Sequence, residues 1–471
     1  MLLFVMVDLL FVLGRLELGE EVNLMEICEK AVKLASGFGV DEVEVYFSRS
    51  MAVRVEVERN QIVKADRFCD EGFGVRVIYN RSIGFSYTNH TNLKSLEETV
   101  SRAVKVAKAG KPDKDRKGFP APSKLPEVKN TYDKRVAETS LEDAVEITSR
   151  MLNSALNFDK RVLAFEGLTV AGESLKILVN SNGVSYTDKG TGIGCLLSTL
   201  AKDKGETTPT CFEFEHERTY KINPEKVGVE AAKQAILSLN AKTLETGFYE
   251  VIFSPHALES LLYYTLVNAL KADNVQRGKS KLKGRLGEKI ASENLTIVDD
   301  GLLDGGLNTW RFDDEGTVSK KTVLVEKGIL KGFLYDKYTA DKDFVESTGN
   351  AQRTTIPPYS STPHIEPTNF TILPGKNTLE KMFEETVKGI YVLHLQGAHS
   401  SNPESGEFSV VATPAWMVEK GGLAYPLKGV MLTGVIYDVL ENVVEVADNP
   451  RKVGFLVAPP VKVAKVRVVG K

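Results

Sequence analysis

The chain has 471 residues, of which 42% are hydrophobic and 26% charged, and its formal net charge at pH 7 is −3. A chain of this length exceeds one ordinary hydrophobic core, so we expect two or three folded domains. The near-neutral charge gives no long-range attraction for nucleic-acid phosphates. The sequence carries no helix-turn-helix, zinc-finger or RNA-binding signature, so direct nucleic-acid binding is not expected.

The first 24 residues differ in character from the rest. Their apolar run is interrupted by Asp8 and Arg15, which makes it too short to span a bilayer, and it lacks the basic start of a signal peptide. We interpret residues 1–24 as an N-terminal extension ahead of Met25. No later segment is apolar enough for a membrane span, and the four cysteines show no CxxC or framework spacing. These features predict a cytoplasmic protein with reduced thiols and no membrane contact.

Residues 25–110 predict an N-terminal α+β domain. A helical apolar face comes first. Val43, Val45 and Phe47 then alternate with acidic partners, and valines alternate with charged side chains over residues 52–58. Strict alternation is typical of strands with one solvated face. A helix around Leu96 closes the domain. Residues 111–126 are rich in lysine and proline and predict an exposed linker.

Residues 127–241 predict a central α+β domain. Ser140 and Asp143 have the spacing of a variant capping box at a helix start. The segment 180–183, Asn-Ser-Asn-Gly, indicates a hairpin turn between two strands. Pro224 suits the first turn of a closing helix.

Residues 242–471 predict a β-rich C-terminal domain with a large mixed or antiparallel sheet, because strand-like segments punctuated by glycine fill it apart from a helix at 255–271. The expected fold class is therefore α+β. N-terminal α/β sandwich-like domains are followed by this β-rich domain.

Four stretches in a fixed order are similar to a known family: residues 56–89; 313–342 followed by 347–353; 402–429; and the helix at 255–271. On these stretches the chain resembles the TldD/PmbA family, historically called modulators of DNA gyrase. The resemblance extends from Met25 over nearly the whole chain. It implies a cytosolic proteolytic complex in which TldD and TldE form a heterodimer and cleave unfolded peptides in a closed cavity, with zinc in TldD.

The helix at 255–271 differs from the catalytic branch of that family. That branch carries His-Glu-x-x-x-His, and here Tyr263, Tyr264 and Asn268 stand at those positions. A phenol and a carboxamide bind zinc poorly at neutral pH compared with an imidazole. The catalytic branch also has a metal-binding cysteine near its C-terminus, whereas no cysteine follows Cys211 here. The resemblance thus implies the TldE/PmbA branch, no metal in this chain, and zinc in a TldD-like partner.

The spacing of the family's metal ligands, which correspond to residues 263 and 268 here, places a constraint on the shape of the helix. Residues five apart lie about 140° apart on an ideal helix, so ligands at that spacing converge only through a π-type widening or another distortion. The sequence leaves two arrangements open. The helix either keeps the widened backbone at Tyr263, Tyr264 and Asn268, or these side chains simply pack in the core. On the same helix we expect His256 to start the helix and Glu259, three residues later, to be solvated rather than a metal ligand.

Asn350 and Arg353 are substrate or interface candidates in a turn-forming segment. Arg353 offers a planar donor for a carboxylate, suited to a peptide or an interface. It could equally pin a turn to Asp313 or Asp314.

His399 and Glu407 are two further candidates. His399 precedes a polar loop and could reach a cleft, whereas His394, five residues earlier, would face the other side of a strand. Glu407 lies in a segment that is either an edge strand able to add a peptide or an inner strand.

Two functions remain open on this basis. The first is a non-catalytic TldE/PmbA-like subunit that completes the chamber of a TldD–TldE-type zinc metalloprotease and presents peptide to a TldD-like partner. The alternative is a homodimeric peptide-binding or gyrase-associated regulatory protein without protease activity.

Overall fold

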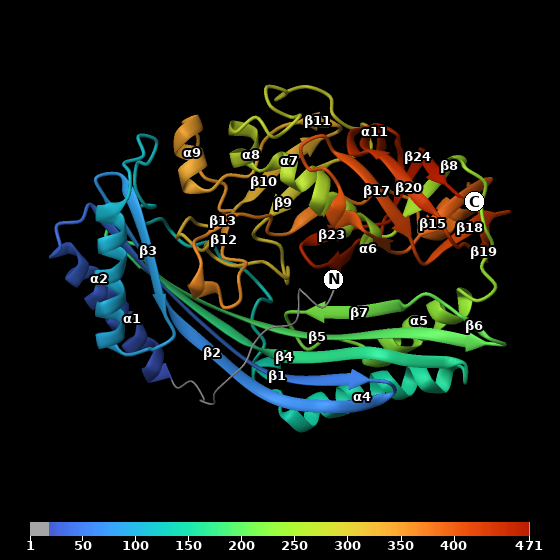
Figure 1. Cartoon of the computed structure of the whole chain (residues 1–471), viewed down its shortest axis with the longest axis horizontal. Coiled ribbons are helices and arrows are strands. Elements are labelled where there is room, and N and C mark those ends of the chain that lie inside the picture. The colour runs from blue at the N-terminus through green and yellow to red at the C-terminus, as the bar shows by residue number, and fades with distance from the viewer. Residues whose placement is uncertain (1–17, 471) are drawn as a thin grey trace.

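The computed structural model describes residues 18–470, and side chains from residue 23. Most of the expected extension at 1–24 therefore lies outside the described residues. Residues 18–24 form the first turns of helix α1 (Leu18–Ser36). A long curved sheet lies beside a β-rich body formed by the C-terminal half (Figure 1). The fold class is α+β, as predicted.

Within the described residues, the curved sheet has seven antiparallel strands in the order β3-β2-β1-β4-β5-β6, with β7 also paired to β5. Residue pairs such as Val45 and Val179 join β1 to β4 along most of their length. The two expected N-terminal units thus share one continuous sheet. Its strands are β1 (Glu42–Glu58), β2 (Gln61–Tyr79), β3 (Ser82–Thr88), β4 (Val162–Asn180), β5 (Ser185–Asp203), β6 (Glu206–Thr207) and β7 (Cys211–Glu217).

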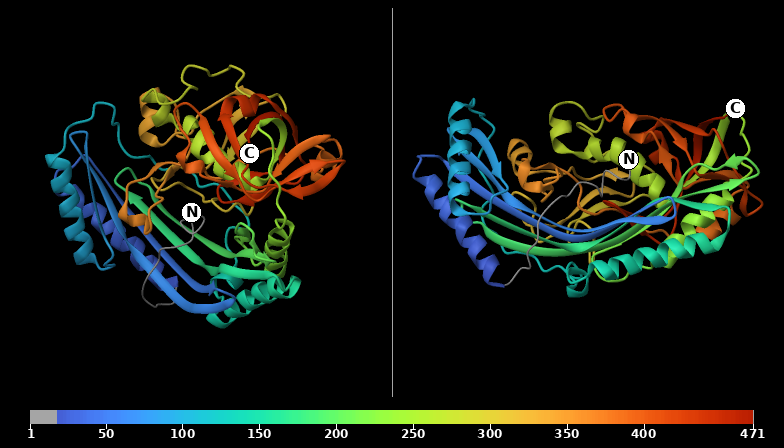
Figure 2. Two further views of the ribbon diagram at one scale, coloured as in Figure 1. Left: turned by 45° about the vertical axis from the view of Figure 1, so that its right-hand side comes forward. Right: turned by 60° about the horizontal axis from the view of Figure 1, so that its bottom comes forward.

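Helices cover the outer face of this sheet (Figure 2). Helices α1 and α2 (Leu93–Ala109) pack on one end, and α4 (Leu141–Phe158) and α5 (Pro224–Leu237) pack on the other. The short helix α3 (Lys134–Ala137) precedes α4. The predicted capping box of Ser140 and Asp143 is present at α4. No helix in residues 18–470 combines the length and apolar character needed to cross a membrane.

The inner face of the sheet is buried around Glu44, contrary to the expectation from the alternating pattern, whereas Glu58 at the end of β1 is exposed as expected. Val45 and Phe47 pack against the helices, while Glu44 and Tyr46, which alternate with them, are buried on the other side. The C-terminal body covers that side, and Tyr46 packs near Phe312 of that body. Glu44 therefore forms ion pairs with Arg76 and Arg353 at an internal interface, whereas Arg54 pairs with Asp66 on the neighbouring strand β2.

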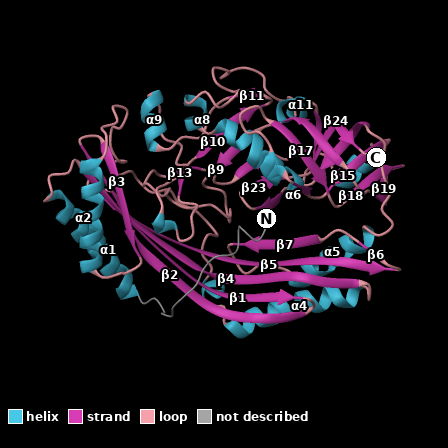
Figure 3. Cartoon of the chain, in the orientation of Figure 1, coloured by secondary structure: helices cyan, strands magenta, loops and turns pink. Residues whose placement is uncertain are grey.

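The C-terminal body contains the predicted large mixed sheet and a second sheet beside it (Figure 3). In the described residues, nine strands follow the order β16-β17-β20-β24-β8-β15-β18-β19, with β21 on β24, and six follow β11-β10-β9-β14-β23-β22. Strands β12 and β13 pair separately. The strands are β8 (Gly247–Phe253), β9 (Ile297–Asp300), β10 (Lys321–Glu326), β11 (Ile329–Leu330), β12 (Ala351–Gln352), β13 (His364–Ile365), β14 (Phe370–Ile372), β15 (Lys388–Val392), β16 (Leu395–Gln396), β17 (Glu407–Ala412), β18 (Ala415–Glu419), β19 (Gly422–Pro426), β20 (Met431–Val435), β21 (Val443–Val446), β22 (Arg451–Val453), β23 (Leu456–Ala458) and β24 (Val461–Val469).

One apolar cluster fills the space between these two sheets, and the helix at the predicted position lies within it. The body's further helices are α8 (Ala272–Gln276), α9 (Lys337–Asp343), α10 (Leu379–Glu384) and α11 (Ile436–Glu441). The segment at 111–126 is largely exposed, as expected of a linker, but Phe119 is buried and its amide donates to Glu42. The connector is thereby fixed to the curved sheet.

Candidate functional site

The helix with the altered motif contains a π turn. Helix α6 (Pro255–Leu262) begins at Ser254, whose hydroxyl accepts from the Ala257 amide, and leads directly into the π turn η2 (Tyr263–Val267) and α7 (Asn268–Leu270). The side-chain amide of Asn268 donates to the Tyr263 carbonyl at 3.0 Å. Of the two arrangements that the sequence left open, the structure has the widened backbone, and the widening falls where the resemblance places the metal ligands.

Tyr263 and Tyr264 form a half-buried aromatic group at this turn. Their rings are perpendicular with centroids 5.1 Å apart, and the Tyr263 ring lies 5.3 Å from that of Phe455. Burial raises the pKa of both phenols above their ordinary value, and the nearby Glu366 carboxylate raises that of Tyr263 further. Both phenols therefore remain protonated at neutral pH.

These side chains do not fit a zinc ion. A zinc ligand must present a deprotonated or neutral lone pair, whereas the two phenols hold their protons and the Asn268 amide is engaged with the backbone. In residues 18–470, no group of three or more His, Cys, Asp or Glu side chains is placed to hold a metal ion.

Glu259 lies one turn before Tyr263 and is half-buried, which corrects the expectation of a solvated carboxylate. Its carboxylate faces the turn between β22 and β23, where a Cβ on Gly454 would lie 3.3 Å from its Oε1 atom. The Ser260 hydroxyl donates to Oε2 at 3.3 Å. Burial raises the pKa of Glu259 to about 7, because desolvation disfavours the charged form.

An ion pair lies beside the Tyr263 ring. The Lys271 ammonium is 2.6 Å from Glu366 Oε1 and 5.6 Å from the Tyr263 ring centroid. His364 places Nε2 3.3 Å from the same carboxylate oxygen. Nothing local in the sequence indicated this group, because its members are brought together from segments more than ninety residues apart.

His256 starts helix α6 as expected but faces away from Glu259. Its Nε2 lies 3.5 Å from Glu213 Oε1 on β7, and its ring centroid is 4.8 Å from that of His394. His394 stacks on Phe212 at 3.8 Å. Burial lowers the pKa of both imidazoles. This buried group joins the curved sheet to the C-terminal body.

His399 is exposed in a 3₁₀ turn (Ala398–Ser400), and its ring centroid lies 6.4 Å from that of Tyr264. It is thus brought to the rim of the aromatic group, on the side away from buried His394. Glu407 is exposed at the start of β17. In the described residues β16 pairs only with the last two residues of β17, so the first half of β17 has a strand partner on one side, β20.

Asn350 and Arg353 are buried and bonded within the chain. The Asn350 amide donates to Asp299 at 2.7 Å. The Arg353 guanidinium donates to Glu44 of β1 at 3.0 Å, and its backbone amide donates to Asp314 at 2.8 Å. The Arg353 backbone thus fixes the turn to Asp314, while its guanidinium pairs with Glu44, which neither of the two expected arrangements included.

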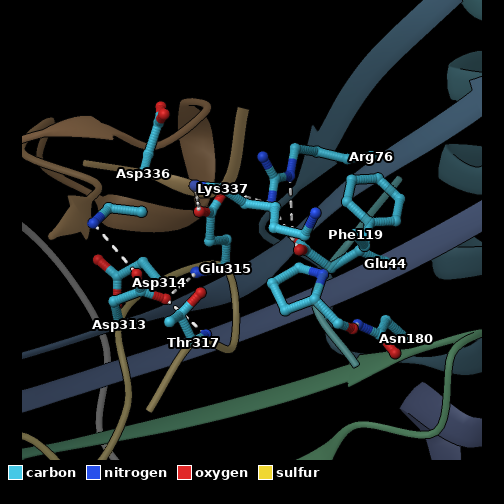
Figure 4. Close-up of polar contacts among 12 residues, drawn as sticks. Glu44, Arg76, Phe119, Asn180, Asp313, Asp314, Glu315, Thr317, Asp336 and Lys337 are labelled. Carbon is cyan, nitrogen blue, oxygen red and sulfur yellow. Dashed lines mark hydrogen bonds and ion pairs between the residues drawn. The ribbon is translucent and has the colours of Figure 1, made fainter. Parts of the chain in front are cut away.

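The Glu44 partner of Arg353 belongs to a buried ion cluster between the curved sheet and the C-terminal body (Figure 4). Arg76 on β2 donates to Glu44 at 2.8 Å and lies 3.7 Å from Glu315. Burial and the neighbouring Asp313 raise the pKa of Glu315, and burial raises that of Asp313 to about 7. A cavity of about 210 Å³ adjoins the cluster, but its basic side chains are already paired.

The fold and the altered helix together define a class of protein. The sequence matches the PmbA/TldA metallopeptidase domain 1 over residues 43–107, the central domain over 134–239 and the C-terminal domain over 246–470. The chain belongs to the PmbA/TldD family, as the resemblance indicated.

The chain is also similar to individual proteins over nearly their whole length. The chain is 34% identical over 435 residues to an uncharacterized protein of Methanocaldococcus jannaschii, covering 92% of this chain and 97% of the relative. It is similar to the structure of TldE from Thermococcus kodakarensis, with a TM-score of 0.89 and 28% identity over 94% of this chain and 100% of that one. A Thermotoga maritima structure described as a modulator of a DNA gyrase has a TM-score of 0.85 and 26% identity, covering 94% and 99%.

Proposed function

We propose that this chain is the non-catalytic, TldE-type subunit of a cytosolic zinc metalloprotease complex that degrades or processes unfolded peptides. The observation that carries the proposal is the π turn at Tyr263–Val267, which is retained although Tyr263, Tyr264 and Asn268 replace the metal-binding residues. Zinc and the catalytic base would belong to a TldD-like partner.

The chemistry of the turn supports this division of roles. Zinc-assisted hydrolysis requires imidazole or carboxylate ligands, an open position for water, and a base within reach of that water. Here the phenols stay protonated, and the Asn268 amide bonds to the Tyr263 carbonyl. In this division of roles the π turn maintains the shape of the site in this chain, and the partner carries out hydrolysis.

A second proposal is a homodimeric peptide-binding protein without protease activity. The first half of β17 favours this proposal, because it pairs with β20 on one side only and an extended peptide can add to the other side of such a strand. Association with gyrase would be a further form of this proposal, in keeping with the description of the Thermotoga maritima relative.

Metal content and peptide cleavage of the purified chain test the first proposal. The chain alone should hold no stoichiometric zinc and cleave no unfolded peptide, while a mixture with a TldD-like partner should cleave peptide in a chelator-sensitive way. The partner alone is the matched control. Tight zinc in this chain, with proteolysis abolished by a chelator, would contradict the proposal.

A further inference from the structure

Glu259 has no basic partner in the structure. Among residues 18–470, no Lys, Arg or His nitrogen lies within ion-pair distance of its carboxylate, and its one hydrogen bond comes from the neighbouring Ser260 hydroxyl. A half-buried carboxylate that has lost part of its hydration is stabilised by a cation or by protonation. The chain provides no such cation at this position.

The basic residues of the surrounding segments are held elsewhere. Lys271 is paired with Glu366 at 2.6 Å. On the strand next to Gly454, Arg451 binds Glu213 and Lys452 lies 2.5 Å from Glu217. None of these side chains can turn to Glu259 without breaking an ion pair.

Aromatic rings flank the same carboxylate. Tyr263 and Tyr264 follow Glu259 by four and five residues, and the charge of Glu259 contributes to the raised pKa of both phenols. Phe455 comes from the turn that the carboxylate faces, and its ring lies 5.3 Å from that of Tyr263. The faces of aromatic rings attract cations, and the attraction increases with partial desolvation.

The site is open to solvent. Glu259, Tyr263, Tyr264 and Phe455 are all half-buried, and exposed His399 lies at the edge of the group. A carboxylate and aromatic faces that are reachable from solvent and lack an internal cation have the composition of a site for an organic cation.

We propose that Glu259, Tyr263, Tyr264 and Phe455 bind the ammonium group of a peptide, with Glu259 as the counter-ion and the rings around the alkyl chain. The inference rests on the proposed function in taking a peptide as the ligand. The ammonium group could be the peptide's N-terminus or a lysine side chain, since both present the same charge to the site.

Three extended peptides distinguish these sources. All carry a fluorophore at the C-terminus and lack arginine: the first has a free N-terminus and no lysine, the second is the same peptide N-acetylated, and the third is N-acetylated with one internal lysine. Fluorescence polarisation with the full chain at pH 7.5 measures each Kd. At least one ammonium-bearing peptide should bind about tenfold more tightly than the second, as one charge-assisted contact with aromatic support provides.

Matched variants assign the effect to the site. Glu259→Gln should remove the preference, and Glu98→Gln, an exposed acid on α2, should leave it unchanged. Tyr263→Leu should weaken the preference and Tyr263→Phe should retain it, because phenylalanine keeps the ring. Circular dichroism confirms that each variant is folded.

Three results would overturn the inference: equal affinity for all three peptides, a preference that persists in Glu259→Gln, or no binding of any peptide. Each leaves the subunit proposal standing, since metal content and association with a partner are measured independently of these peptides.

Discussion

At the scale of the residue, the environment of Glu259 makes the folded state favour its protonated form. Its pKa rises from an ordinary 4.5 to about 7 because the carboxyl is desolvated against the β22–β23 turn. Between these values the unfolded chain has released the proton and the folded chain retains it. The associated stabilisation is therefore present below pH 4.5 and is lost as the pH rises through about 7.

Replacing the Glu259 carboxyl should change how the free energy of unfolding depends on pH. Glu259→Gln is expected to raise the free energy of unfolding at pH 8 by on the order of 1 kcal/mol, a value reduced for partial exposure, and to change it little at pH 4.5. Urea unfolding at the two pH values measures both quantities, with Glu98→Gln as the surface control. The same increase at both pH values would contradict the assigned cause.

The sequence indicated which residues of the altered helix belong to the candidate site, but not which distant segments pack against them. The motif positions of Tyr263 and Asn268 were predictable because they lie on one helix. The burial of Glu259 was not, because the turn at Gly454 that covers it is almost two hundred residues away. The pairing of the Arg353 guanidinium with Glu44 was not predictable either, because the two residues are more than three hundred positions apart.

At the scale of the element, the π turn is the feature that links the fold to the family's chemistry. The five-residue spacing of the ligands made a π turn one of the arrangements open to this helix, because ligands so spaced converge only through a widening or another distortion. Here the Asn268 side-chain amide closes the turn by donating to the Tyr263 carbonyl. The geometry is therefore a property of this chain's own backbone and packing.

Restoring the ligands should then restore binding of the metal. In the triple variant Tyr263→His, Tyr264→Glu, Asn268→His, we expect zinc to bind at about one ion per chain and to be removed by a chelator, since the backbone already brings these positions together. Affinity should be modest, because no cysteine follows Cys211. Atomic absorption after dialysis measures the content. Tyr263→His alone is the control, and a triple variant that is folded but binds no more zinc than the control would refute a preformed geometry.

At the scale of the whole molecule, the curved sheet and the C-terminal body form one unit through buried ion pairs. Glu44 alternates with apolar residues in a strand that the sequence correctly predicted, and it pairs with Arg76 on the next strand. The solvation of Glu44 was predicted wrongly, because the alternating pattern does not reveal what covers the polar face. The pairing of β1 with β4 also escaped prediction, since the partner residues are more than one hundred positions apart.

The proposed subunit role requires that this chain bind a metal-bearing relative in the cell. Affinity purification of the full chain from the cells that make it, read by mass spectrometry, detects such a complex. We expect a stoichiometric partner of the same family with intact His-Glu-x-x-x-His on its metal-binding helix. Recovery of the chain alone as a homodimer would refute the subunit role and favour the peptide-binding alternative.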